Sequence, residues 1–277
     1  MPAEGGRGRD RATAPTDPMR LALTRRVGPS IGACELTFRT RTPIDAARAA
    51  AQHEAYERAL VQAGCHLLPL PAEPDLPDSV FIEDAALVLD EVAVILRSGA
   101  ASRRPETPSV ARALAPYRDV AVIGEPGTLD GGDVLRVGRT LFVGATGRSN
   151  EAGIAQLRAA VAPLGYDVRA VPVTGCLHLK SAITLVTPDT ALINRQWVDA
   201  GPFAGLDLLD VHPDEPDAAN ALLVGTTLIY PASHPLTRRG LEGRGIEVLA
   251  VDVAELEKAE GAVTCCSIVF EVPALAT

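Results

Sequence analysis

One short unit recurs along this chain, and its recurrence limits the possible folds more than any other feature. Each unit holds two short apolar runs joined by a turn such as Leu-Asp-Glu, Val-Gly-Arg, Thr-Pro-Asp or Val-Gly-Thr. The complete copies are SVFIEDAALVLDEVAVIL (79 to 96), DVLRVGRTLFVG (133 to 144), AITLVTPDTALIN (182 to 194) and NALLVGTTLIY (220 to 230). A fifth copy, CCSIVFEV (265 to 272), has a single run. First runs thus start about every 40 to 50 residues, which indicates repeated supersecondary units.

Five units without a long linker favour a closed ring, because closure is more economical than five open edges. The alternating segment MRLALTRR (19 to 26) could supply the run that the fifth unit lacks. We therefore expect an α/β fold in which the five units close a ring around a central site. It would form a single domain over 19–277, preceded by a disordered tail over 1–18. An ordinary α/β sheet fits the same periodicity.

Two segments have the pattern of helices. The segment 43–65 is rich in Ala, Leu and Arg, with Pro43 in its expected first turn and Gly64 at its end. The segment 150–165 begins at Asn150, a residue type that caps helix N-termini. Helices between the apolar runs support an α/β architecture.

Composition narrows the functional class. The net charge of −9 provides no basic field to neutralise phosphates, so we expect no nucleic-acid partner, while a small cationic ligand is compatible. No apolar stretch approaches the roughly 20 residues of a membrane span, and the first residues lack the apolar region of a secretory signal. Five cysteines, an odd and mostly scattered set, do not form a disulfide framework, which favours a reducing cytoplasm.

Residues that can carry chemistry stand directly before or at the start of each first run. They are Asp78, Asp130 and Asp133, His178, Asp217 and Asn220, and Cys265. In a ring, equivalent positions of equivalent units meet at one axis. Taken singly, each has a plainer explanation, since a Cys in a strand is usually a small buried hydrophobe and the Gly-Gly of LDGGD is at minimum a turn signal. Their shared position favours a central pocket that holds carboxylates, an imidazole and a thiol.

Several long motifs together resemble the dimethylarginine dimethylaminohydrolases, which belong to the guanidino-group-modifying pentein superfamily with its five-bladed α/β propeller. The motifs are ACELTF, LPDSVFIEDAALV, RSGAASRRPE, LDGGDVLRVGRTLFVGATGRSN, HLKS and ELEKAEGAVTCCSIV, and most of them span about 75 to 272. The resemblance implies hydrolysis of Nω-methylated arginine to citrulline and a methylamine. The substrate partner would be a small cationic guanidino amino acid.

The resemblance also implies roles for individual residues. Cys265 would be the nucleophile, His178 the general acid and base, and Asp130 the carboxylate that orients His178. The implied substrate-binding residues are Asp78, Glu83 and Asp84 for the guanidinium, Arg97 and Arg148 for the α-carboxylate, Leu36 in a mobile lid, and Ala259 and Glu260 near the amino end. Position 260 is Glu where some relatives carry Asp.

The implied chemistry uses side chains alone. Carboxylates bind guanidinium N–H groups, a thiolate attacks the central carbon, and an imidazole protonates the departing amine. We therefore expect no cofactor and no metal site, and a monomer or homodimer. Alternatives within the superfamily are an arginine deiminase and an amidinotransferase, and a non-enzymatic binding protein is the alternative of a different class.

The two adjacent cysteines should have different roles. Neighbouring strand residues point to opposite faces. One face of the last run is apolar throughout, with Cys266, Ile268, Phe270 and Val272, whereas the face that begins with Cys265 is mixed. The pattern therefore predicts that Cys265 faces the pocket and Cys266 packs in the core.

Overall fold

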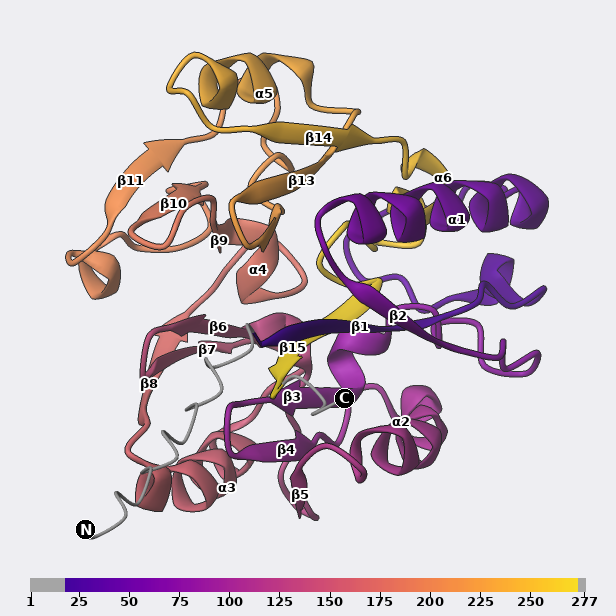
Figure 1. Cartoon of the computed structure of the whole chain (residues 1–277), viewed down its shortest axis with the longest axis vertical. Helices are drawn as coiled ribbons and strands as arrows, with labels where there is room; N and C mark the ends of the chain where they lie inside the picture. Colours follow the sequence, from indigo (N-terminus) through magenta and orange to yellow (C-terminus); the bar gives the residue numbers. More distant parts are fainter. Residues whose placement is uncertain (1–17, 274–277) are drawn as a thin grey trace, which may run out of the picture.

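The computed structural model describes residues 18–273, so the tail expected over 1–18 lies almost wholly outside the described residues, as do residues 274–277. The helices are α1 (Ala46–Gln62), α2 (Thr107–Leu114), α3 (Glu151–Val161), α4 (Leu179–Ala182), α5 (Pro235–Glu242) and α6 (Ala254–Glu257). Of these, α1, α2, α3 and α5 lie toward the outside of the molecule (Figure 1). Within the described range, no helix has the length and apolar character needed to cross a membrane.

Five three-stranded sheets follow one topology, in which an antiparallel pair is extended by a parallel third strand. Four sheets are consecutive in sequence: β3 (Ala86–Val88), β4 (Val92–Ile95) and β5 (Asp119–Val122); β6 (Val134–Val137), β7 (Thr140–Ala145) and β8 (Asp167–Pro172); β9 (Ile183–Leu185), β10 (Thr190–Ile193) and β11 (Asp207–Asp210); β12 (Leu222–Val224), β13 (Thr227–Pro231) and β14 (Val248–Val251). The fifth contains β15 (Ser267–Val272), β1 (Met19–Arg25) and β2 (His66–Leu70).

The two ends of the described chain complete this fifth sheet together. β15 pairs antiparallel with β1, from Met19 opposite Val272 to Thr24 opposite Ser267. This confirms the expectation that MRLALTRR supplies the run missing from the last unit. The parallel neighbour β2 then gives the sheet the same topology as the other four.

The hydrophobic core follows the alternation of the middle strand of each sheet. In β7, Leu141 and Val143 pack in a cluster with residues of β4, while Phe142 packs in a different cluster with residues of β10. The other middle strands alternate in the same way, so that separate clusters join β4 to β1, β10 to β13, and β13 to β1. Each sheet therefore packs both faces on neighbouring sheets.

The helix limits follow capping chemistry. α1 begins at Ala46, where Asp45 accepts a hydrogen bond from the Arg48 N–H at 3.0 Å, so the expectation that Pro43 lies in the first turn was wrong. The helix ends before Gly64, whose φ of +91° suits glycine, as expected. Asn150 caps α3 through the Gly153 N–H at 2.8 Å, which confirms that prediction.

Candidate active site

The chemistry-bearing residues of three units lie at or within short turns before the first strands, rather than in the strands themselves. Asp130 precedes the 3-10 turn Gly131–Asp133, His178 precedes α4, and Cys265 lies in the turn before β15. The two glycines of LDGGD are required by close packing. A Cβ on Gly131 would lie 2.0 Å from the Glu83 carbonyl oxygen, and one on Gly132 would lie 2.5 Å from Nδ1 of His178. The Gly-Gly pair therefore lets three separate units meet.

These turns enclose a small cavity of about 20 Å³. Most of the residues expected at the site line it: Asp78, Asp84, Arg148, His178, Ala259, Glu260 and Cys265, together with Glu35, Phe81, Arg103, Leu177 and Gly261. The volume holds on the order of one water molecule. This cavity by itself is therefore too small for an amino acid of the size of arginine.

His178 and Asp130 form a buried pair. Nε2 of His178 donates to Oδ2 of Asp130 at 3.2 Å, and the second carboxylate oxygen accepts the Gly99 N–H at 3.0 Å. Burial opposes a charged imidazole, but the carboxylates of Asp84, Asp133 and Asp130 outweigh it and raise the pKa of His178 to about 9. The imidazole is therefore protonated at neutral pH and can donate a proton.

The Cys265 thiol is neutral in this environment. Burial, followed by the nearby carboxylates of Glu83 and Asp84, raises the pKa of Cys265 to about 12. The Cys265 carbonyl accepts the Glu83 N–H at 3.1 Å, which ties the turn before β15 to the acidic segment. Its neighbour Cys266 is fully buried in the core against α1, as expected. The face argument behind that expectation was wrong, because both cysteines lie in the turn before β15 and Cys266 packs in a different cluster from Ile268, Phe270 and Val272.

The acidic residues of the segment 78–84 have different partners. Asp78 accepts the Glu35 N–H with both oxygens, at 3.2 and 3.1 Å, and burial raises its pKa. Glu83 is paired with Lys180 Nζ at 2.6 Å. Asp84 accepts from the Gly132 N–H at 2.8 Å. Although burial favours the neutral acid, His178 and Arg103 hold the pKa of Asp84 well below its usual value.

Arg103 is a site residue that the sequence reasoning missed. Its buried guanidinium pairs with Asp84 at 2.5 Å and with Glu106 at 3.0 Å, and donates to the carbonyls of Asp78 and Phe81. Its only signal in the sequence is the SRRPE stretch of a motif quoted above, where nothing distinguishes it from its neighbour. The structure gives Arg103 the position that fixes the acidic segment.

Three expected substrate-binding residues, Glu83, Arg97 and Leu36, do not line the cavity. Arg97 instead donates to Glu125 at 3.1 Å and to the Gly127 carbonyl at 3.3 Å. Leu36 is half-buried and packs against the core cluster around α1. By contrast, Nη1 of Arg148 is buried, lies 3.6 Å from Asp130, and has no hydrogen-bond partner in the described part of the chain.

The loop 35–39 closes one side of the cavity through the carboxylate of Glu260. Glu260 has a left-handed φ of +59° and accepts the backbone N–H groups of Thr37, Phe38 and Arg39 at 2.5 to 3.0 Å. The Arg39 guanidinium also pairs with Asp217 at 3.0 Å. The loop is therefore held by two residues, Glu260 and Asp217, that are distant from it in the sequence.

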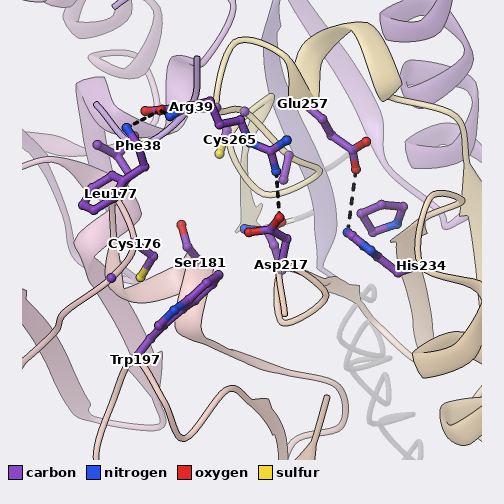
Figure 2. A pocket seen from close by; sticks show the side chains of 16 residues that line it. Phe38, Arg39, Cys176, Leu177, Ser181, Trp197, Asp217, His234, Glu257 and Cys265 are labelled. Atoms are coloured by element: carbon purple, nitrogen blue, oxygen red, sulfur yellow. Dashed lines mark hydrogen bonds and ion pairs between the residues drawn. The ribbon is translucent and has the colours of Figure 1, made fainter. Parts of the chain in front are cut away.

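A larger pocket of about 360 Å³ adjoins this loop and also reaches Cys265 (Figure 2). The residues of the fourth unit, Asp217 and Asn220, line it, as do Phe38, Arg39, Trp197 and His234. It shares Leu177, Glu260, Gly261 and Cys265 with the small cavity. The thiol is thus reached from two sides.

Asp84, Asp130 and His178 offer ligand atoms within 4.8 Å of one another, a spacing that a metal ion can use. These atoms already have partners, because Arg103 and the Gly132 N–H bind Asp84 and His178 binds Asp130. The cluster is therefore electrostatically satisfied by protein groups.

Comparison with known proteins defines the class and then the family. No protein-family model matches the chain. The chain has an α/β pentein fold, since it superimposes on the solved structure of a Pseudomonas aeruginosa dimethylarginine dimethylaminohydrolase, a cysteine-to-serine mutant complexed with citrulline. The TM-score is 0.86 at 31% identity, over 91% of this chain and all of the other.

The curated relatives agree. The dimethylarginine dimethylaminohydrolase of Streptomyces coelicolor is 45% identical over 252 residues, 91% of this chain and 97% of the relative. That of Pseudomonas aeruginosa is 33% identical, over 82% and 90% respectively. The chain therefore belongs to the dimethylarginine dimethylaminohydrolase family.

Proposed function

We propose that this protein hydrolyses Nω-methylated L-arginine to L-citrulline and methylamine or dimethylamine. The observation that carries the proposal is the meeting of Cys265, protonated His178 and the carboxylates of Asp78 and Asp84 in one cavity. Family membership supports the same reaction, and citrulline is bound in the related solved structure. A thiol beside acids is suited to a cationic carbon centre.

In the proposed complex, the acidic segment binds the guanidinium. Asp78 and Asp84 line the cavity. Glu83 precedes Asp84 in the chain and is paired with Lys180. Arg148 would bind the α-carboxylate, which is supported by its Nη1 atom: among the described residues this atom has no hydrogen-bond partner, and its one ion pair is with Asp130 at 3.6 Å. Arg97 would have to leave Glu125 to reach the same group. Ala259, Glu260 and Leu36 would contact the amino end once the loop 35–39 has moved.

The reaction needs a thiolate, a proton donor and a water molecule. The substrate cation lowers the cost of ionising Cys265, and the thiol proton passes to solvent. Sulfur then forms a bond with the guanidinium carbon, and His178 gives its proton to the departing amine as the C–N bond breaks. Neutral His178 next takes a proton from water, whose oxygen attacks the thiouronium carbon. The C–S bond breaks, citrulline leaves, and sulfur regains a proton.

We also propose that residues 19–277 form one domain in which the five sheets close a five-bladed ring with pseudo-fivefold symmetry. The support lies in the core. Five clusters join the middle strands in the cyclic order β1, β4, β7, β10, β13 and back to β1. The pairing of β15 with β1 is where such a ring would be fastened.

The activity test compares asymmetric dimethylarginine, monomethylarginine and arginine as substrates. We expect citrulline and the matching methylamine in equal amounts, with arginine the poorest substrate. Cys265→Ser should abolish citrulline formation with the fold retained, whereas Cys266→Ser should remain active and lose about 1–3 kcal/mol of unfolding free energy. Preference for plain arginine would favour a deiminase, and release of amine only when an acceptor amine is added would favour an amidinotransferase.

A further inference from the structure

Asp133 is a buried carboxylate that the reaction above does not use. It ends the 3-10 turn that follows Asp130, and it is fully inaccessible to solvent. A carboxylate in such a place is costly unless several donors satisfy it. Its donors therefore show what the residue is for.

Three donors bind Asp133: one precedes β9, and two lie in the loop after β7. Oδ1 accepts the Leu179 N–H at 3.0 Å. Oδ2 accepts the hydroxyl groups of Thr146 and Ser149, each at 2.6 Å. The packing around the carboxylate is tight, because a Cβ on Gly144 would lie 2.6 Å from Oδ1.

Each donor is adjacent to a proposed active-site residue. Leu179 follows His178 in the chain. The Ser149 hydroxyl accepts the Asp130 N–H at 3.2 Å, and the Thr146 hydroxyl accepts the Arg148 N–H at 3.1 Å. Each hydroxyl donates to Asp133 and so presents its lone pairs to these backbone N–H groups. One carboxylate thus holds the backbone at three site residues.

We infer that Asp133 is a positioning residue. It fixes the relative positions of His178, Asp130 and Arg148, which it reaches through Leu179, Ser149 and Thr146 respectively. This inference rests on the proposed function. Misplacing a reacting group by about 1 Å can cost roughly a hundredfold in rate. The network divides into two arms, because Ser149 acts on the orienting carboxylate and Thr146 acts on the arginine proposed to bind substrate.

The two arms predict a separation of kinetic constants that general destabilisation would not produce. Ser149→Ala should lower kcat with little change in KM, and Thr146→Ala should raise KM with little change in kcat. Thr146→Ser keeps the hydroxyl and should restore the wild-type KM. Asp133→Asn, which is isosteric, should change both constants, with kcat lower by about tenfold to a hundredfold.

Glu215→Gln is the matched control. Glu215 is also a buried carboxylate, and it accepts the N–H groups of Leu236 and Thr237 at the start of α5, away from the lining of the cavity. It should alter thermal stability but neither constant. Equal changes in kcat and KM in the Ser149 and Thr146 variants, or wild-type kinetics in a folded Asp133→Asn protein, would overturn the inference.

A second measurement needs no substrate and so separates this inference from the proposed function. His178 faces the carboxylates of Asp84, Asp130 and Asp133, near the guanidinium groups of Arg103 and Arg148 and the Cys265 thiol. Loss of the Asp133 charge should lower the pKa of His178, measured by an NMR titration of its ring protons. Ser149→Ala should disorder the same resonances. An unchanged midpoint in Asp133→Asn would count against the inference even if the enzyme were active, whereas an inactive wild-type protein with the expected shift would count against the function alone.

Discussion

Cys265, the proposed nucleophile, lies in surroundings that would keep it inactive until a cationic substrate binds. Its thiol is neutral because burial and the charges of Glu83 and Asp84 oppose a thiolate. The same carboxylates attract a guanidinium. A bound cation would therefore relieve the repulsion that holds the proton on sulfur, so that recognition and activation become a single event.

This predicts how fast the thiol is alkylated at different pH values. Without ligand, the rate at Cys265 should rise only well above pH 9, and an unreactive cation of guanidine size should move the midpoint to lower pH. Mass spectrometry of the peptide that contains Cys265 measures the rate, and Cys265→Ser provides the blank. A midpoint near the ordinary thiol value without ligand, or one that the cation leaves unchanged, would contradict substrate-assisted activation.

At the scale of an element, the loop 35–39 holds groups that we propose bind the substrate. Its backbone N–H groups bind Asp78 and Glu260, and the Thr37 hydroxyl accepts from Arg148 at 3.4 Å. With this loop in place the cavity admits about one water molecule. We therefore expect opening of the loop to free these proposed binding groups and to enlarge the small cavity.

Glu260→Ala should loosen this loop. Position 260 has a positive φ, which is unfavourable for any residue with a Cβ. Ala carries a Cβ as Glu does, so the substitution removes the carboxylate without relieving this backbone strain. We expect trypsin to cleave after Arg39 several-fold faster than in the wild-type protein. Glu247→Ala, an exposed residue with no side-chain hydrogen bond in the described chain, is the control. Identical cleavage rates in the two variants would show that Glu260 does not hold the loop.

Over the whole molecule, the central site carries more carboxylates than cations. Arg103 is shared by Asp84 and Glu106, and burial raises the pKa of Glu106 to about 7. Burial likewise raises the pKa of Asp133 to about 6. Together with His178, whose pKa is also raised, these groups bind protons more tightly in the folded state than in the unfolded state.

The folded protein should therefore lose stability as the pH rises from about 5 to 9. Each raised pKa contributes stability that is present below the unfolded value and lost through the folded value. Asp84 has the opposite sign, so the protein should also lose stability in strong acid. The melting temperature, measured from strong acid to pH 9, tests both losses of stability. Glu106→Gln should reduce the decrease in melting temperature below pH 7. A melting temperature that rises steadily from pH 5 to 9 would contradict this charge balance.

Local patterns were enough to predict much of this protein. Alternating runs and turn residues predicted the repeated strand pairs, because these signals depend on neighbouring residues. MRLALTRR was correctly matched to the last run, because that unit lacked its second run. The position of residues within the repeat, together with the family resemblance, predicted that Asp78, His178 and Cys265 meet, and all three line one cavity.

The tertiary structure alone decided how charges from different units are paired. Arg103 and Arg97 look alike in sequence, yet the first is buried between Asp84 and Glu106 and the second lies beside Glu125. Glu260 binds the loop 35–39, more than 200 residues away in the chain. The sequence repeat could not predict these contacts. The partner of a buried charge depends on which turns of distant units come within a few ångströms of each other.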